Sequence, residues 1–193
     1  MLEGGKNEVV HAYNTGEVRG YSFVGGIVGA VKMWSVAVEE KEPNNIENIY
    51  NTGRVSNVSD STVGSLAGGI DADDRRKCYI GHAIWKEGTG SRAVGWVKPN
   101  SEDFVTIGLN RVRTEAEMKR ASTYADYLKT AYNTPAVATE GGKGLPWRIY
   151  EGKTMPLLTG LMQGTKHAGG GTKVYDGAAP TITGDHLYLD ASK

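Results

Sequence analysis

The sequence repeats Ala12-Tyr13-Asn14-Thr15-Gly16-Glu17-Val18 as Ile49-Tyr50-Asn51-Thr52-Gly53-Arg54-Val55, 37 residues later. After a few polar residues, each copy leads into a glycine-rich apolar run. The first run is Val24-Gly25-Gly26-Ile27-Val28-Gly29, and the second, 39 residues later, is Val63-Gly64-Ser65-Leu66-Ala67-Gly68-Gly69. A degenerate third copy extends from Cys78 to Val97. Self-similarity at such a period is typical of repeat architectures.

Each copy predicts a short strand, a turn at Asn-Thr-Gly, a second short strand and a flat glycine-rich strand. Asn and Gly both tolerate the positive φ of a tight corner, whereas Tyr, Val and Ile favour extended backbone. Glycine within an apolar strand lets another layer approach closely. The residues predicted to define the strands and turns are Tyr13, Asn14, Gly16, Gly25, Gly26, Gly29, Tyr50, Asn51, Gly53, Gly64 and Gly68.

Units of this kind cannot bury their apolar faces alone, but they can do so when they stack as rungs that pair their strands. We therefore expect a mainly β fold in which residues 1–113 form the rungs of a parallel β-solenoid. Because parallel crossovers are right-handed in nearly all proteins, we expect the solenoid to be right-handed. The alternative is a pair of ordinary hairpins in a β-sandwich.

The composition excludes several classes of protein. The chain has 193 residues, of which 27 are Gly, and it carries 22 basic and 22 acidic side chains. This glycine content, about double the ~7% of an average protein, is incompatible with a mostly helical fold. The balanced charge argues against a nucleic-acid surface, and no window approaches the ~20 apolar residues of a transmembrane helix. The single Cys78, set among apolar neighbours, cannot form an intramolecular disulfide and is predicted to be a buried structural thiol.

From Thr114 onward the hydrophobic pattern changes to a helical period. One apolar stripe consists of Met118, Ala121, Ala125, Leu128 and Tyr132. Thr114 and Glu117 have the spacing of a capping box. Since the open end of a solenoid exposes unpaired strand edges, we expect residues 114–163 to form a helical cap, with Thr114, Glu117, Trp147 and Pro156 as its markers. The alternative is a helix packed on the side of the sheet.

Residues 164–193 are predicted to be a linker and the start of a further β module. The run Gly169-Gly170-Gly171 is typical of a flexible linker. Only about twenty residues come after it, which are too few to bury a core of their own. The chain is therefore expected to be a piece of a longer protein, and this also explains why the piece has no export signal.

Candidates for chemistry are few. The run Gly88-Thr89-Gly90-Ser91-Arg92-Ala93 fits a dinucleotide-loop pattern without a following helix, and the four His residues are widely separated, so no cofactor or metal is predicted. Asp71, Asp73 and Asp74 are the densest acidic cluster and are weak candidates for calcium ligands. An exposed turn, neutralised by the basic residues next to it, is favoured. With Asp60, this cluster also supplies the carboxylates that a glycosidase would need ~5 to 9.5 Å apart.

The pattern Tyr-Asn-Thr-Gly-x-Val, succeeded by Val-Gly-Gly-Ile-Val-Gly, resembles the GLUG repeat of large secreted bacterial surface proteins, which include filamentous-haemagglutinin-like adhesins. Residues 12–30 and 49–69 carry the resemblance, from which Ser65 and Ala67 depart. The segment from Trp147 to Leu158 resembles the region immediately C-terminal to such repeats in those adhesins. The tail Gly171-Thr172-Lys173-Val174-Tyr175-Asp176-Gly177 resembles the start of a YDG or MBG-type module.

The resemblance implies a right-handed β-solenoid with a non-catalytic, structural and presentational role in a secreted or surface-exposed bacterial adhesin. The implied partners are neighbouring modules of the same chain and, through the full-length protein, host-cell glycans or proteins. No cofactor and no nucleic acid is implied. A different class also remains open, namely a polysaccharide-active β-helix enzyme or a carbohydrate-binding module.

Overall fold

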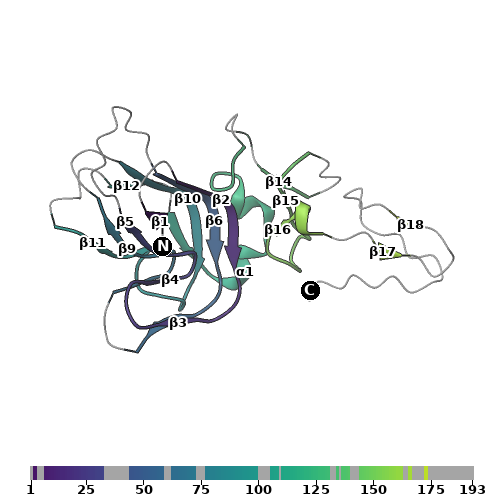
Figure 1. Cartoon of the computed structure of the whole chain (residues 1–193). Helices are drawn as coiled ribbons and strands as arrows, with labels where there is room; N and C mark the ends of the chain where they lie inside the picture. The colour runs from purple at the N-terminus through teal and green to yellow at the C-terminus, as the bar shows by residue number, and fades with distance from the viewer. Residues whose placement is uncertain are drawn as a thin grey trace. The chain divides into compact units, whose positions relative to one another are not determined.

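The computed structural model describes residues 2–3, 7–32, 44–58, 62–72, 77–99, 105–108, 110–130, 134, 136–139, 144–162, 165–166 and 172–173. The chain divides into two compact units, Met1–Glu115 and Ala116–Lys193. The expected mainly β fold is confirmed, because strands make up most of the regular structure of the described residues (Figure 1). Within the described residues, no helix is long and apolar enough to span a membrane.

The first unit contains two larger parallel sheets. One has the order β12-β10-β6-β2, with β13 also paired to β10; its strands are β2 (Glu8–Asn14), β6 (Asn44–Asn51), β10 (Cys78–Lys86), β12 (Val105–Ile107) and β13 (Asn110–Arg113). The other has the order β1-β5-β9-β11; its strands are β1 (Leu2–Glu3), β5 (Val28–Lys32), β9 (Ala67–Asp71) and β11 (Val94–Val97). Two short parallel pairs link them: β3 (Val18–Gly20) with β7 (Val55–Asn57), and β4 (Val24–Gly25) with β8 (Val63–Gly64).

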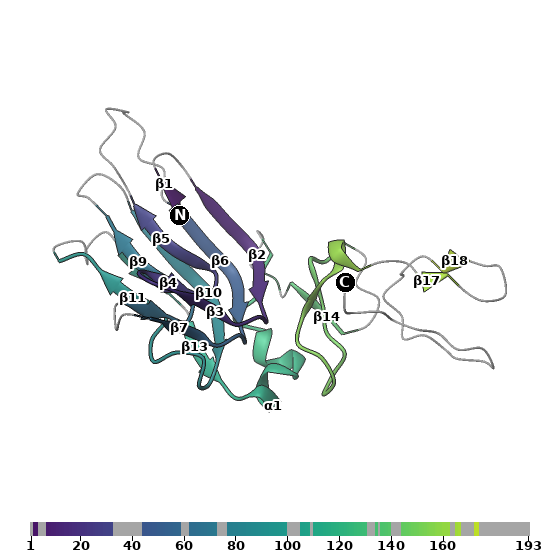
Figure 2. The ribbon, with the colours of Figure 1, turned by 60° about the horizontal axis from the view of Figure 1, so that its bottom comes forward.

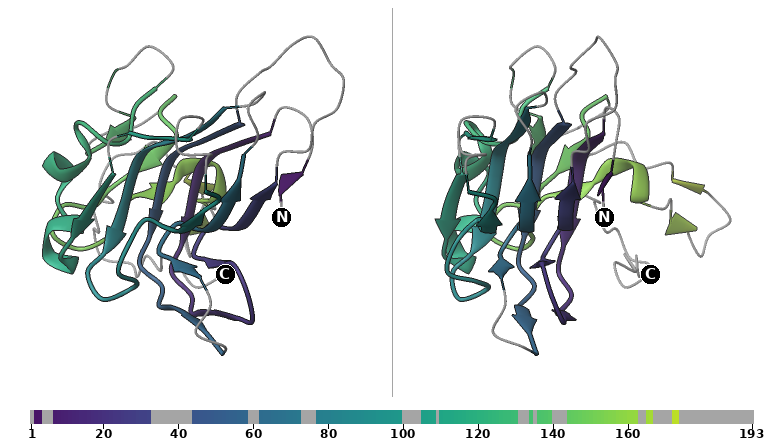
Figure 3. Two further views of the ribbon diagram at one scale, coloured as in Figure 1. Left: turned by 90° about the vertical axis from the view of Figure 1, so that its left-hand side faces the viewer. Right: turned by 60° about the vertical axis from the view of Figure 1, so that its left-hand side comes forward.

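The strand register matches the sequence repeat. Tyr13 pairs with Tyr50 and Asn14 with Asn51, so the offset of 37 residues in the sequence is the offset between neighbouring strands. The third copy joins the same two sheets, through β10 beside β6 and β11 beside β9. Each copy thus adds one strand to each larger sheet, and the copies lie side by side in Figures 2 and 3.

The core of the first unit lies between the two larger sheets and is made of small and β-branched side chains. Its most buried members, exposed by 1% or less, are Val31, Ile46, Ile49, Leu66, Ala67, Ile70, Cys78, Ile80 and Ala83. Burial of a large aliphatic side chain contributes about 1.5–3 kcal/mol. Because the strands are in register, equivalent apolar residues of successive copies stack on one another and form a single continuous core.

A bend for which the sequence gives no signal recurs within the long strands. His11, Asn48 and His82 occupy equivalent positions and have φ angles of 52°, 55° and 49°. The strand pairing skips this position, since Val10 pairs with Glu47 and the next pair is Ala12 with Ile49. Asn visits the left-handed region more readily than most residues. Three aligned left-handed residues turn the strands at the same place in each copy.

Several repeat glycines are required because backbones of successive copies approach closely. A Cβ added to Gly53 would overlap the carbonyl oxygen of Gly16 in the preceding copy. Likewise, a Cβ on Gly25 would overlap backbone atoms of Gly68, and one on Gly64 would overlap those of Gly95. The predicted reason for glycine in the flat strands, close approach of another layer, therefore holds at these positions.

The second unit is described separately and has short elements. They are η2 (Ala121–Tyr124), β14 (Val137–Ala138), β15 (Trp147–Arg148), β16 (Leu157–Leu158), η3 (Thr159–Leu161), β17 (Thr165–Lys166) and β18 (Thr172–Lys173). Strand β15 pairs parallel with β14 and antiparallel with β16, and β17 pairs antiparallel with β18. The side chains of Met118, Tyr124, Leu128, Trp147 and Ile149 are fully buried. Most of the predicted linker and YDG-like tail, residues 167–171 and 174–193, lies outside the described residues.

The long helix expected from residue 114 to 132 is not formed, and no helical cap is evident in the described part of the chain, which does not include Tyr132. The α-helix α1 has only four residues, Glu115–Met118. The amide that would continue it, on Ala121, donates instead to Glu151 Oε2 at 2.8 Å. The hydroxyl of Tyr124 donates to the Met118 carbonyl at 2.7 Å, and Arg120 is extended. Side-chain partners thus take the backbone groups that a longer helix would use.

The glycines at equivalent corners give a matched stability test. We expect Gly53→Ala to destabilise the protein by about 3 kcal/mol or more, because the new Cβ overlaps the Gly16 carbonyl and must push two copies apart. Gly16→Ala is the control, since the nearest atom to its Cβ is Asn14 Oδ1 at 3.7 Å; we expect its effect to stay within about 0.5 kcal/mol. Urea unfolding measures both, and equal costs would contradict the close approach.

Candidate functional site

The most organised polar constellation in the described part of the molecule is the pair of Asn-Thr-Gly corners. Asn51 is fully buried and its side chain makes four hydrogen bonds. Its Oδ1 accepts the Gly53 amide at 3.0 Å and Asn14 Nδ2 at 2.9 Å. Its Nδ2 donates to the carbonyls of Gly53 and Ser65, both at 2.9 Å. One side chain therefore closes its own turn, binds the preceding copy and holds the glycine-rich segment of its own copy.

Asn14 repeats part of this arrangement at the exposed corner of the first copy. Its Oδ1 accepts the Gly16 amide at 3.1 Å, and its Nδ2 donates to the Gly16 carbonyl at 2.8 Å as well as to Asn51. The tyrosines before the two asparagines stack with ring centroids 5.2 Å apart and planes 11° from parallel. The residues Tyr13 and Tyr50, like the asparagines, thus connect successive copies.

The glycine-rich segments place the remaining repeat residues against backbone. A Cβ on Gly26 would overlap the Ser65 carbonyl and lie 2.5 Å from Asn51 Nδ2. A Cβ on Gly29 would lie 3.2 Å from the Phe23 carbonyl oxygen, and Gly68 lies against the Phe23 backbone. At these three glycines the space that a side chain would need is taken by neighbouring atoms, so they serve the packing of the copies.

The acidic cluster considered for calcium is only partly described. The Asp71 carboxylate lies 2.7 Å from Lys98 Nζ, in a pair whose side chains are 40% and 48% exposed. Such a surface ion pair contributes at most about 1 kcal/mol. Asp60, Asp73 and Asp74 lie outside the described residues. Among the residues that are described, no group of three or more His, Cys, Asp or Glu side chains is positioned to hold a metal ion.

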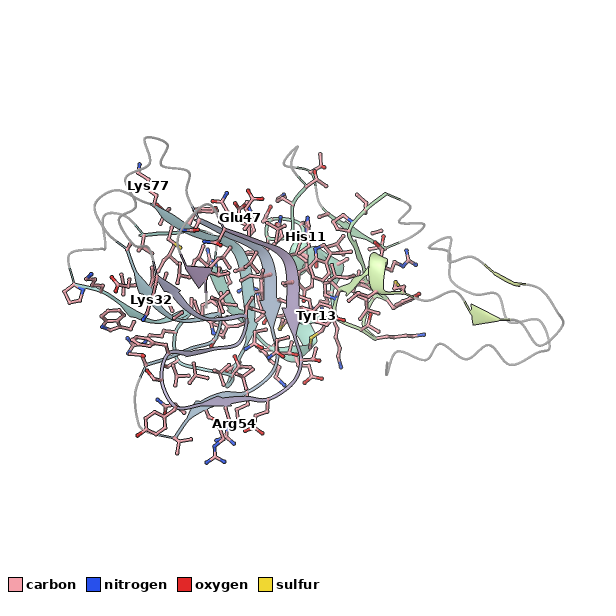
Figure 4. The ribbon with its side chains drawn as sticks, in the orientation of Figure 1. His11, Tyr13, Lys32, Glu47, Arg54 and Lys77 are labelled. Carbon is pink, nitrogen blue, oxygen red and sulfur yellow. The ribbon has the colours of Figure 1, made fainter. Side chains whose placement is uncertain are left out.

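A titratable pair on the sheet formed by β2, β6 and β10 was not predicted from the sequence. Glu47 Oε2 lies 3.3 Å from His82 Nδ1, and both side chains are partly exposed, at 24% and 21%. The pKa of Tyr79 is raised, first by burial and second by the charge of Glu47. Burial lowers the pKa of His11 below its ordinary value of 6.5. Figure 4 shows His11 and Glu47 on neighbouring strands.

The Glu47–His82 pair places one carboxylate beside an imidazole. Hydrolysis of a glycosidic bond by either usual route requires two carboxyl groups flanking the bond. The signal for this pair was absent from the sequence because Glu47 and His82 lie 35 residues apart and meet only through the strand pairing.

Cys78 and Asn44 occupy one fully buried column. Burial raises the pKa of the Cys78 thiol to about 12, so it stays protonated at neutral pH and is a poor nucleophile. Asn44 Oδ1 accepts both the amide and Nδ2 of Asn7, at 2.8 and 3.0 Å. Its own Nδ2 has no hydrogen-bond partner among the described residues, because the equivalent position in the third copy is Cys78 rather than a further asparagine.

The dinucleotide-like run belongs to the corner of the third copy. Gly88 has a φ of 81°, and the Thr89 hydroxyl donates to the Lys86 carbonyl at 2.8 Å. The Thr89 carbonyl in turn accepts the amide of Val55 in the second copy. Strand β11, rather than a helix, comes after this corner, so the run lacks the helix N-terminus that binds a pyrophosphate.

The four residues expected to mark a cap all lie in or beside the short elements described above. Thr114 is exposed and directly precedes α1, which contains Glu117. Trp147 is fully buried in β15, and Pro156, just before β16, is also buried. Beside Trp147, the buried Arg148 stacks on Tyr150 at 5.1 Å from the ring centroid, while its Nε and Nη1 atoms lack hydrogen-bond partners in the described part of the chain.

Comparisons of the chain with known protein families, with curated proteins and with solved structures find no match.

The two corner asparagines make a matched pair for mutation. We expect Asn51→Ala to cost about 3 kcal/mol of stability, because it removes four hydrogen bonds and leaves the Ser65 carbonyl and Gly53 amide unsatisfied. Asn14→Ala should cost about 1 kcal/mol, since its corner is exposed to water. Thermal and urea unfolding provide the comparison. A smaller loss for Asn51→Ala than for Asn14→Ala would refute the structural role assigned to the buried corner.

The lowered pKa of His11 predicts a dependence of stability on pH. Because the unfolded chain binds a proton at His11 more readily than the folded chain, stability should fall as pH decreases below 6.5. Well above that value, His11 is neutral in both states and contributes no slope. His11→Asn, which keeps a residue tolerant of the left-handed backbone, should remove this part of the slope. Urea unfolding of both proteins between about pH 8 and 5 tests the difference.

Proposed function

We propose that residues 1–113 form a right-handed parallel β-solenoid, and that the chain is a non-catalytic structural segment of a secreted or surface-exposed bacterial adhesin. The observation that carries the proposal is the buried corner of Asn51, which joins its own turn to the preceding copy. The asparagines of the repeated Tyr-Asn-Thr-Gly motif connect neighbouring copies, as a structural role requires.

The in-register pairing supports the coil arrangement. Strands of three copies succeed one another in the same order in two sheets, and every pairing between these copies is parallel. Chain segments that return to the same sheet in the same direction require a crossover in each copy, and such crossovers are right-handed in about 98% of cases. The proposal of a right-handed solenoid rests on this rule and on the GLUG-like sequence pattern.

A stack of coils joined by backbone and asparagine hydrogen bonds suits a spacer. Each copy lengthens the stack by the spacing between paired strands, about 4.8 Å. In the proposed role, the stack holds neighbouring modules of the same chain away from the cell surface. Recognition of host-cell glycans or proteins then belongs to the full-length protein, and the same role requires that the segment be exported.

One observation favours a second candidate, a carbohydrate-binding module. Phe23 and Trp96 are only partly buried, and their rings form a tilted pair with centroids 5.5 Å apart. The Phe23 ring lies over Gly69, where a Cβ would overlap it. Aromatic rings on an open sheet surface offer stacking area to a sugar. The same rings also shield the sheet, which is the simpler role.

A glycan and protein binding screen on the 193-residue chain separates the candidates. As a spacer, the chain should bind no glycan and release no reducing sugar from plant or bacterial polysaccharides. Binding that is lost in both Phe23→Ala and Trp96→Ala, but retained in the exposed control Tyr21→Ala, would establish the carbohydrate-binding module instead. Sugar release that is lost in Glu47→Gln or Asp71→Asn would establish an enzyme and overturn the proposal.

A further inference from the structure

We propose that the outer edge of the first copy is a docking surface for one further coil of the same repeat type. The edge consists of Tyr13, Asn14, Thr15 and Gly16, at the end of β2 and in the corner after it. The proposal rests on the coil arrangement inferred above, and it does not depend on the adhesin role.

The second copy shows how such a coil is held. Each of its four motif residues contacts the first copy: the Tyr50 ring stacks on Tyr13, and Asn51 Oδ1 accepts Asn14 Nδ2. The Thr52 amide donates to the Asn14 carbonyl at 2.9 Å. Gly53 lies against the Gly16 carbonyl, with no room for a Cβ. The motif Tyr-Asn-Thr-Gly therefore works as a set of contacts to the copy before it.

The first copy presents the equivalent groups of its own Tyr-Asn-Thr-Gly motif at its outer edge. Asn14 Oδ1 accepts the Gly16 amide alone among the described residues, whereas the equivalent atom of Asn51 accepts two donors. The Thr15 amide, unlike that of Thr52, has no acceptor in the described part of the chain. Thr15 and Gly16 are exposed, and the Tyr13 ring is partly exposed.

Gly16 is the most informative of these residues. At Gly53 the glycine is needed because the preceding copy fills the space of a Cβ, but the space at Gly16 is open to a distance of 3.7 Å. No φ in the left-handed range requires glycine at either position. Close approach of a backbone is the one use that the structure shows for a glycine at this corner, and at Gly16 that backbone would belong to another coil.

The sheet β1-β5-β9-β11 already has a strand on the outer side of the first copy. Strand β1 pairs with β5 on the side opposite to β9, one strand beyond the first copy. Leu2 pairs with Val31 and Glu3 with Lys32 in a parallel register. The occupant that fits is therefore a parallel coil whose Asn amide donates to Asn14 Oδ1, whose backbone carbonyl accepts the Thr15 amide, and whose Gly carbonyl faces Gly16.

The test uses the full chain and an extended chain in which a copy of residues 7–43 is inserted before Asn7. This insertion supplies one complete repeat of 37 residues in the observed register. In the unextended chain, Gly16→Ala should change the melting temperature by less than about 2 °C. In the extended chain, the same substitution should lower it by as much as Gly53→Ala does, by about 5 °C or more.

Two further measurements keep the test decisive. In the extended chain, alanine at the inserted glycine equivalent to Gly16 should be tolerated, because the open corner has moved there. Hydrogen exchange at the Thr15 amide should slow at least about 100-fold on extension. An unchanged exchange rate, continued tolerance of Gly16→Ala, or digestion of the inserted residues by protease would overturn the proposal.

A measurement of self-association tests the alternative occupant of this edge, a second copy of this chain. If the unextended chain forms head-to-tail oligomers that Gly16→Ala dissolves, the edge binds a second copy of this chain, and the proposed occupant is wrong. Sedimentation of the wild-type chain and of Gly16→Ala provides this result. Failure of these tests leaves the outcome of the binding screen unchanged, so the two proposals can fail independently.

Discussion

The structure of the first unit depends on the buried hydrogen bonds of Asn51. A buried amide that lacked partners would cost several kcal/mol, so its four bonds must form together or the corner must open. Those bonds extend to a turn, to the previous copy and to the glycine-rich segment. One side chain thereby fixes the position of three backbone segments, and the parallel register results from that position.

The glycines are also needed, because they allow the backbones of successive copies to come into contact. Hydrogen bonds between strands set a spacing of about 4.8 Å, and at the corners the approach of the chain leaves no space for a Cβ. The apolar residues then stack in columns, which makes the core continuous from copy to copy. Side-chain amides and glycines specify the register, while the burial of Val, Ile and Leu supplies most of the favourable free energy.

The sequence predicts the first unit far better than the second. In the repeats, identical residues lie on top of one another, so the offset between Tyr13 and Tyr50 directly predicts a strand pairing. In the second unit, the helical stripe competes with partners that are distant in sequence. Glu151 takes the Ala121 amide, and a local pattern contains no information about such a partner. The same limit applies to Glu47 and His82, and to the left-handed bend at His11, Asn48 and His82, where the residue type changes between copies.

The sequence by itself determined the repeat, its offset and the residues of its corners, because a periodic parallel stack places equivalent residues in equivalent surroundings. Only the tertiary structure decided which of two identical corners is buried, where the helix stops and which charged side chains meet. The physical reason is that these features depend on the layer that covers a residue. Asn14 and Asn51 lie in the same Tyr-Asn-Thr-Gly motif, yet Asn51 is fully buried and Asn14 is not.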